Sequence, residues 1–213
     1  DDDVFVCFDT ELLRVAGIWQ GGFISPEGLA LLSYDIPLRK KGSGQTKLPK
    51  PQGKMIAATG LYPGWHKQGQ DNYQDPRSRG PDEKELGRGP LPSEYGEWLG
   101  VEDAGDSVIL HYTLFGGTVR EQFRVEKQQR KTVIVRSITM EDISDTINLV
   151  VNDTRRWFLG DLVVNTYTCD GGSRNEVVAY SGDGEVIKSH DLKPYDFSSK
   201  GKIEKHWPNS ITT

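Results

Sequence analysis

Residues 107–126 carry the sequence SVILHYTLFGGTVREQFRVE, in which two runs of alternating apolar and polar residues flank a pair of glycines. Alternation with a period of two is typical of a β-strand with one buried face. The dipeptide Gly116-Gly117 indicates a two-residue hairpin turn, because glycine adopts the positive φ angles that such turns need. We therefore predict strands at residues 107–115 and 118–126, paired as an antiparallel hairpin.

Shorter runs of the same kind continue on both sides of this hairpin, at residues 4–8, 12–19, 22–25, 29–32, 132–140, 146–151, 162–168, 176–180 and 185–188. Turn residues separate them, as in Gly21-Gly22, Pro26-Glu27-Gly28 and Gly182-Asp183-Gly184. We find no convincing amphipathic helix. Many short strands with regular turns favour an all-β fold, and we expect an antiparallel β-sandwich or a jelly-roll-like domain.

Residues 37–100 differ from both flanks. They contain eight of the chain's eleven prolines and eleven of its 24 glycines, without a sustained period. Such a stretch is either disordered or a functional loop folded over a scaffold. Its tyrosines and tryptophans favour the ordered loop, because disordered segments are usually poor in aromatic residues. We expect one domain over residues 1–190 that includes this long irregular loop, followed by a polar tail at residues 191–213.

The composition argues against two kinds of partner. The formal net charge is −5 and the pI is near 5.4, whereas nucleic-acid binding depends on concentrated Lys and Arg. No stretch approaches the roughly 20 apolar residues that a membrane helix needs. We expect no nucleic-acid partner and no membrane-spanning segment.

Motifs for common cofactors are absent from the sequence: it has no P-loop, Rossmann fingerprint, Gly-x-Ser-x-Gly elbow or Cys-x-x-Cys-His haem attachment. The histidines have no zinc-ligand spacing. Acidic residues at 1–3, Asp9, Asp103 and Asp106 offer oxygen ligands, but they do not follow the spacing of a calcium loop. We therefore predict no cofactor and no metal, with calcium left as an alternative that no motif supports.

The two cysteines, Cys7 and Cys169, fit no metal or redox spacing. They would form one long-range disulfide in an oxidising compartment, or remain two buried thiols. We favour buried thiols, because each cysteine lies inside a predicted strand.

Two ionisable residues interrupt the apolar faces of neighbouring predicted strands. Glu121 lies on the face that carries Val119 and Phe123, and Arg136 lies on the apolar face of the next strand. If both faces point inward, each charge needs a partner, so the economical inference is a Glu121–Arg136 pair. A bridge in the core or at a sheet end is favoured over an acid–base role, because no second catalytic group is placed beside Glu121.

Aromatic residues supply the candidate ligand-binding positions, which are Trp19, Trp65, His66, Tyr95 and Trp98. Trp65 and His66 end the glycine turn at residues 63–66, and an aromatic ring beside a polar group there would suit a sugar. The competing interpretation is that such a tryptophan anchors the long loop to the sheet. Exposed tryptophans would indicate carbohydrate, and tryptophans buried against protein would indicate assembly.

Three groups of short motifs are also present. The first is VCFDT at 6–10 with WQGGF at 19–23, the second is DPR at 75–77 with GPLP at 89–92, and the third is GDSVILHYT at 105–113 with VRE at 119–121 and RSI at 136–138. Over residues 4–150 this set resembles an uncharacterised β-rich domain near the N-terminus of large exported proteins of planctomycete-type bacteria. There the domain typically precedes a propeller resembling sugar dehydrogenases and a c-type cytochrome domain.

The resemblance implies a periplasmic or extracellular location and a parent protein that handles redox chemistry or polysaccharides. It assigns no activity to the domain itself, and this chain contains neither the haem motif nor a propeller repeat. We therefore expect a non-catalytic binding or assembly module that contacts carbohydrate or a partner protein. The alternative is a carbohydrate-active enzyme, of the isomerase or hydrolase kind, that uses Glu121.

Overall fold

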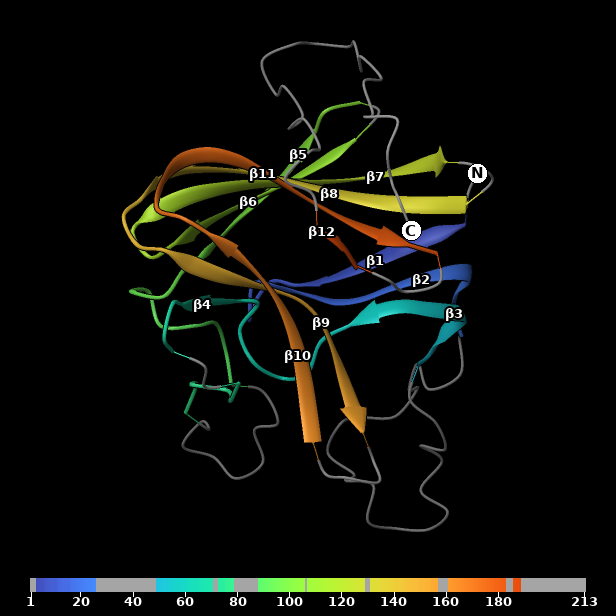
Figure 1. Ribbon diagram of the computed structural model, residues 1–213, viewed down its shortest axis with the longest axis horizontal. Helices are drawn as coiled ribbons and strands as arrows, with labels where there is room; N and C mark the ends of the chain where they lie inside the picture. The colour runs from blue at the N-terminus through green and yellow to red at the C-terminus, as the bar shows by residue number, and fades with distance from the viewer. Residues whose placement is uncertain are drawn as a thin grey trace.

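The computed structural model describes residues 3–25, 49–70, 73–78, 88–105, 107–128, 131–156, 161–182 and 186–188. In this part of the chain every regular element is a β-strand, which confirms the predicted all-β class (Figure 1). The strands are β1 (Val4–Asp9), β2 (Arg14–Ile24), β3 (Pro51–Ala58), β4 (Trp65–Lys67), β5 (Trp98–Asp103), β6 (Val108–Leu114), β7 (Gly117–Gln128), β8 (Lys131–Ile143), β9 (Ile147–Arg156), β10 (Asp161–Cys169), β11 (Gly172–Ser181) and β12 (Val186–Lys188).

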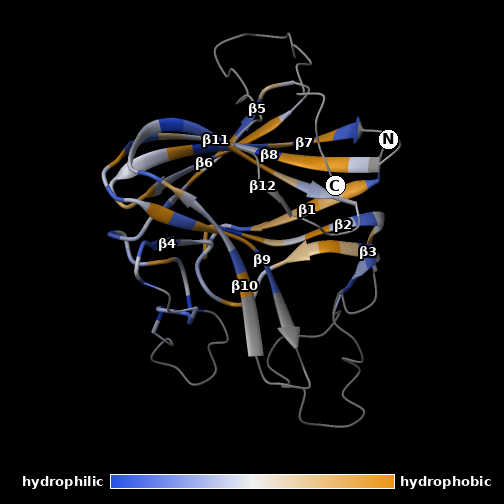
Figure 2. Ribbon diagram, in the orientation of Figure 1, coloured by the Kyte–Doolittle hydropathy of each residue, from blue (hydrophilic) through white to orange (hydrophobic). Residues whose placement is uncertain are grey.

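The strands form three antiparallel sheets, in the orders β1-β2-β3, β10-β9-β4 and β12-β11-β8-β7-β6-β5. One cluster of buried side chains is shared by all three sheets, and it includes Ile18 of β2, Ile138 of β8 and Leu149 of β9. Hydrophobic residues are concentrated on the strands around this cluster (Figure 2). The arrangement is sandwich-like, with the six-stranded sheet on one side of the shared core.

The predicted hairpin is present, but its turn lies one residue earlier than expected. Phe115 and Gly116 have positive φ angles of 48° and 89°, and Leu114 pairs with Gly117 as the first rung of the β6–β7 ladder. Gly117 is needed for another reason, since a Cβ atom there would overlap the backbone carbonyl of Glu141 on β8. The turn places the Phe115 ring beside Tyr95 in the loop that precedes β5.

The predicted turn at Gly21-Gly22 is wrong, because both glycines lie inside the single long strand β2. They pair with Gly53 and Gln52 of β3, and a Cβ on Gly21 would lie 2.9 Å from the Cα of Gly53. Here glycine permits close approach of two backbones rather than a reversal of the chain.

The expectation that residues 37–100 form an irregular loop needs correction, because β3, β4 and the start of β5 lie in that range. β3 pairs with β2 although its first five residues are exposed, so backbone hydrogen bonds rather than apolar alternation define it. The predictions at residues 26–32, 183–185 and 191–213, and the loop residues 37–48, 71–72 and 79–87, lie outside the described residues.

Both cysteines are free thiols, but they differ in environment. Cys169 is fully buried, and burial raises the pKa of its thiol to about 12. Cys7 is exposed, which corrects the expectation of two buried thiols. The neighbouring Val6 and Phe8 pack against the core, so Cys7 projects from the opposite face of β1.

This difference predicts the reactivity of the native protein toward a thiol reagent such as dithionitrobenzoate. Cys7 should react promptly, and Cys169 should react only when the chain unfolds, because the reacting species is the accessible thiolate. The measurement is the number of thiols titrated before and after adding denaturant, with Cys7→Ser as the control. Two rapidly titrated thiols, or none in an unreduced sample, would contradict this assignment.

Among the described residues, no helix is long and apolar enough to cross a membrane.

Candidate functional site

The predicted Glu121–Arg136 pair is confirmed, and it lies in the centre of the core. Both side chains are 0% exposed, and Arg136 donates to both carboxylate oxygens, from Nε to Oε1 at 2.6 Å and from Nη2 to Oε2 at 3.0 Å. The two residues sit on the adjacent strands β7 and β8, and their side chains meet diagonally across the ladder. Such a bidentate geometry is the strongest form of carboxylate–guanidinium contact.

The pair extends into a chain of hydrogen bonds through two aromatic residues. Tyr112 donates its hydroxyl to Glu121 Oε2 at 2.8 Å, and the indole Nε1 of Trp65 donates to the Tyr112 hydroxyl at 3.2 Å. Burial, followed by the negative charge of Glu121, raises the pKa of Tyr112 well above its ordinary value. Burial alone would lower the pKa of Arg136, but the Glu121 carboxylate raises it, so the guanidinium stays charged.

This geometry bears on the acid–base role considered for Glu121. Both of its oxygens already accept hydrogen bonds, and the side chain has no exposed surface. The described part of the chain therefore offers no path for a substrate to reach the carboxylate, and it favours the core bridge.

Trp65 connects this chain of hydrogen bonds to the loops outside the sheet. Its backbone carbonyl accepts a hydrogen bond from the Tyr95 hydroxyl, and the Gly64 carbonyl accepts one from the Val150 amide at 2.8 Å. Gly64 is required by close packing, because a Cβ there would overlap the backbone of Leu13. The turn at residues 63–66 is thus held against two sheets at once.

A second set of contacts holds the Asp75-Pro76-Arg77 motif in place. The Arg77 guanidinium donates to Asp75 at 2.9 and 3.0 Å, to Glu11 at 2.8 Å and to the Gly89 carbonyl at 2.6 Å. The hydrogen bond from Arg77 lowers the pKa of Asp75, which is therefore ionised and paired at neutral pH. This single arginine ties the second motif group to the turn that follows β1.

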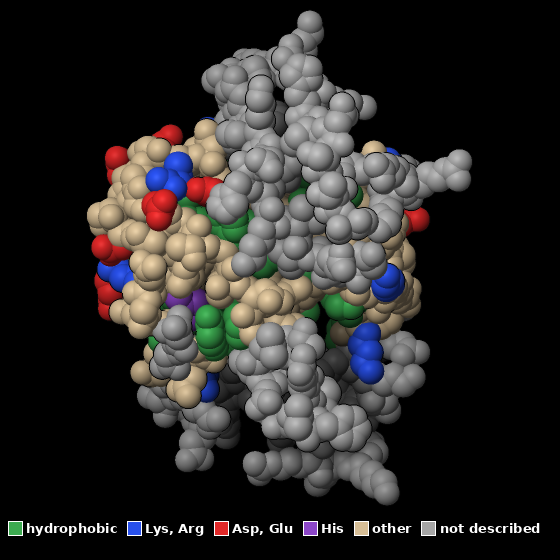
Figure 3. Space-filling model, viewed as in Figure 1, with side chains coloured by type: hydrophobic (Ala, Val, Ile, Leu, Met, Phe, Trp, Pro, Cys, Tyr) green, Lys and Arg blue, Asp and Glu red, His purple; other side chains and the backbone are tan. Residues whose placement is uncertain are grey.

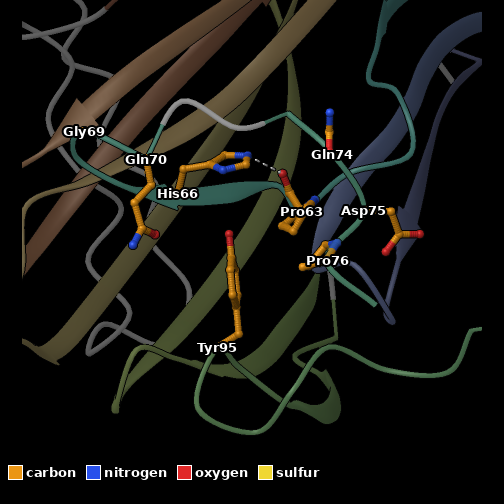
Figure 4. Close-up of a pocket in the computed structure, with 8 residues that line it drawn as sticks. All are labelled: Pro63, His66, Gly69, Gln70, Gln74, Asp75, Pro76 and Tyr95. Carbon is orange, nitrogen blue, oxygen red and sulfur yellow. Dashed lines mark hydrogen bonds between the residues drawn. The ribbon is translucent and has the colours of Figure 1, made fainter. Parts of the chain in front are cut away.

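A pocket with a volume of about 560 Å³ lies between the turn at residues 63–66 and the segment held by Arg77 (Figure 4). Its wall is formed by the turn before β4, the segment after β4 and the loop before β5. The lining residues are Pro63, His66, Gly69, Gln70, Gln74, Asp75, Pro76 and Tyr95.

His66 and Tyr95 are two members of the pocket wall whose rings pack against other aromatic rings. His66 is 4% exposed, and its Nε2 lies 3.0 Å from the Pro63 carbonyl, which indicates that Nε2 carries the proton. Its ring packs edge-on against Tyr73 at 5.0 Å. The Tyr95 ring packs against Phe115, with centroids 4.7 Å apart, and burial raises the pKa of its hydroxyl, so that it remains a donor.

The five predicted ligand-binding residues are therefore only partly brought together. His66 and Tyr95 line the same pocket, whereas Trp65 lies behind that wall and is 0% exposed. Trp19 is 3% exposed and its indole donates to the Gly22 carbonyl at 3.0 Å. Trp98 is partly buried against Phe8, with ring centroids 5.7 Å apart. Neither Trp19 nor Trp65 presents a face on which a sugar ring could stack.

Sequence reasoning missed the polar part of the pocket. Gln70 and Gln74 are exposed, and they lie in the amide-rich run KQGQDNYQDP at residues 67–76. Several closely spaced carboxamides beside an aromatic turn were the available indication of a hydrogen-bonding wall.

Charged side chains on the face seen in Figure 3 include both signs, with apolar groups between them. Within the described ranges there is no group of three or more His, Cys, Asp or Glu residues arranged to hold a metal ion.

A model of one protein family matches residues 6–121, which is more than half of the chain, and its description is "Domain of unknown function (DUF6797)". The chain belongs to this family. No curated protein and no solved structure matches it. The DUF6797 match contains every residue of the pocket wall and ends at Glu121, whereas Arg136 lies beyond it.

The buried pair predicts an asymmetric response of stability to substitution. Arg136→Met should lower the free energy of unfolding by about 3–5 kcal/mol, because it leaves the Glu121 charge buried and unpaired. The double variant E121L/R136M should be more stable than R136M alone. Urea unfolding measures both, with Asp145→Asn as a control on an exposed pair expected to cost less than about 1 kcal/mol.

Equal unfolding midpoints for the wild type and Arg136→Met would show that the pair does not contribute to the stability of the fold.

Proposed function

We propose that this domain is a non-catalytic binding module of a larger exported protein, and that its pocket holds one or two units of a carbohydrate. The burial of Trp19 and Trp65 removes tryptophan stacking as support for a sugar. The proposal is carried instead by a pocket whose wall combines two exposed carboxamides, an imidazole and an aromatic ring. Its volume of about 560 Å³ lies in the range of small-ligand sites.

The lining chemistry matches neutral hydroxyl groups. The carboxamides of Gln70 and Gln74 each both donate and accept hydrogen bonds, as a sugar hydroxyl does. Among the described residues that line the pocket, Asp75 is the only carboxylate; it is paired with Arg77, and the Nε of Arg88 lies 3.6 Å from its Oδ2. A neutral ligand therefore meets no unbalanced charge from these residues, and the Tyr95 ring offers an apolar surface for its C–H groups.

A hydrolytic role has less support from the same wall. Glycoside hydrolysis ordinarily uses two carboxylates on either side of the scissile bond. Asp75 is the single carboxylate among the lining residues that the structure describes, and its oxygens accept hydrogen bonds from Arg77. Binding without turnover is the function that this chemistry suits.

The proposal predicts which substitutions weaken binding. A glycan array should identify one or more neutral oligosaccharides, and titration calorimetry should then show that Gln70→Ala and Gln74→Ala each raise the Kd about five- to tenfold, as expected for one lost hydrogen bond. Gln68→Ala is the matched control, because Gln68 is exposed in the same loop but does not line the pocket.

Failure of every glycan to bind would overturn the carbohydrate assignment. An equal loss of affinity in Gln68→Ala would show that the ligand lies elsewhere.

Contact with a partner protein is a second candidate, and a separate observation favours it. Leu99 and Val101 on β5, and Val108 on β6, are 57%, 61% and 52% exposed. In the described sheet β5 pairs only with β6, and an edge strand with exposed apolar residues is a surface that a neighbouring domain can cover. The family resemblance supports a redox neighbour such as a c-type cytochrome domain.

This second candidate predicts a complex at the β5 edge. The domain produced on its own should bind a haem-bearing partner from the native source in a stoichiometric complex, and Val101→Asp should abolish that binding while the pocket variants retain it. Recovery of the wild-type chain without haem would remove the cytochrome from the proposal.

A further inference from the structure

The pocket wall and the buried ion pair are joined by two sets of hydrogen bonds that meet at Trp65, one on its indole and one on its backbone carbonyl. Arg136 donates to Glu121, Tyr112 donates to Glu121, and the Trp65 indole donates to Tyr112. On the other side of Trp65, its backbone carbonyl accepts the hydrogen bond of Tyr95, a lining residue of the pocket. The next residue along the chain, His66, is also in the wall.

We propose that the Glu121–Arg136 pair is the positioning element of the pocket, and that it acts through Tyr112 and Trp65 on His66 and Tyr95. The ligand in this inference rests on the carbohydrate function proposed above. The connection from the ion pair through Tyr112 and Trp65 to the pocket wall does not rest on that function, because it can be measured without any ligand.

The direction of each hydrogen bond explains why a charge is needed. A tyrosine hydroxyl has one hydrogen to donate, together with lone pairs that accept. An ionised carboxylate is a stronger acceptor than a neutral group, so Glu121 fixes the Tyr112 hydrogen on Oε2. The oxygen of Tyr112 then faces the Trp65 indole as an acceptor. Arg136 donates two hydrogen bonds to the same carboxylate, and both side chains are 0% exposed.

Strand β4, which carries the lining residue His66, is too short for its own backbone hydrogen bonds to hold it in position. β4 has three residues, and its ladder consists of Trp65 opposite Leu149, His66 opposite Asn148 and Lys67 opposite Ile147. A strand of this length contributes few backbone hydrogen bonds. The Trp65 side chain, which is fully buried, supplies an additional attachment to the six-stranded sheet.

The core contains a matched control for this connection. Tyr180 is also 0% exposed and also lies beside Arg136, but its hydroxyl donates to the Val151 carbonyl at 3.3 Å, on the side of β9. Removing either hydroxyl leaves an aromatic ring in the same core. Of the two tyrosines, Tyr112 is the one whose hydroxyl meets the Trp65 indole.

The test compares Tyr112→Phe with Tyr180→Phe by ¹⁵N–¹H NMR. Tyr112→Phe should shift the Trp65 indole resonance and accelerate hydrogen exchange of that indole and of the β4 amides at least tenfold, and Tyr180→Phe should leave both close to wild type. For the glycan selected on the array, Tyr112→Phe should raise the Kd several-fold. An unchanged Trp65 indole and unchanged β4 exchange in Tyr112→Phe would overturn the inference.

Two further outcomes keep the test decisive. If Tyr112→Phe does not fold, the unaltered protein is measured instead: Trp65 indole exchange should require global unfolding, and exchange through a smaller local opening would overturn the inference. If the indole and β4 respond as expected and no glycan binds, the positioning role stands and the carbohydrate function fails.

Discussion

The fold depends on how one guanidinium and one carboxylate are accommodated where water does not reach. Arg136 and Glu121 are both 0% exposed, and an uncompensated charge at such a site would cost several kcal/mol. Glu121 Oε2 accepts hydrogen bonds from both Arg136 and Tyr112, and the Tyr112 hydroxyl in turn accepts one from the Trp65 indole. These hydrogen bonds fix the positions of the four side chains relative to one another. Apolar packing alone would not specify one such arrangement.

The same constraint explains the division of the pocket into fixed and accessible parts. His66 and Tyr95 are attached through Trp65 to the core, whereas Gln70 and Gln74 lie on the exposed segment after β4. Binding costs less when the wall is already ordered, because fewer side chains lose freedom on contact with the ligand. On the Asp75 side of the pocket, Arg77 donates hydrogen bonds to Glu11 and to Gly89, which lie far apart in the sequence.

Much of this could be predicted from the sequence, for an identifiable reason. Side chains in a strand alternate between faces, so a charged residue on an apolar face stands out in the pattern of residues alone, and the Glu121–Arg136 pair followed from that pattern. The pocket did not follow, because its lining residues other than His66 come from loop segments whose spacing has no period. Glycine was ambiguous: Gly116 reverses the chain, while Gly21 and Gly22 allow two strands to approach. A strand of three residues such as β4 is defined by its partners rather than by its own composition.

The side-chain NMR spectrum of Arg136 in the unaltered protein tests the buried ion pair most directly. A guanidinium held by two hydrogen bonds to a buried carboxylate should rotate slowly about its Nε–Cζ bond and should be protected from exchange with water. We expect separately resolved Nη protons and a slowly exchanging Nε proton for Arg136. A single averaged signal in rapid exchange with water, as for a surface arginine, would show that the guanidinium is not held by Glu121.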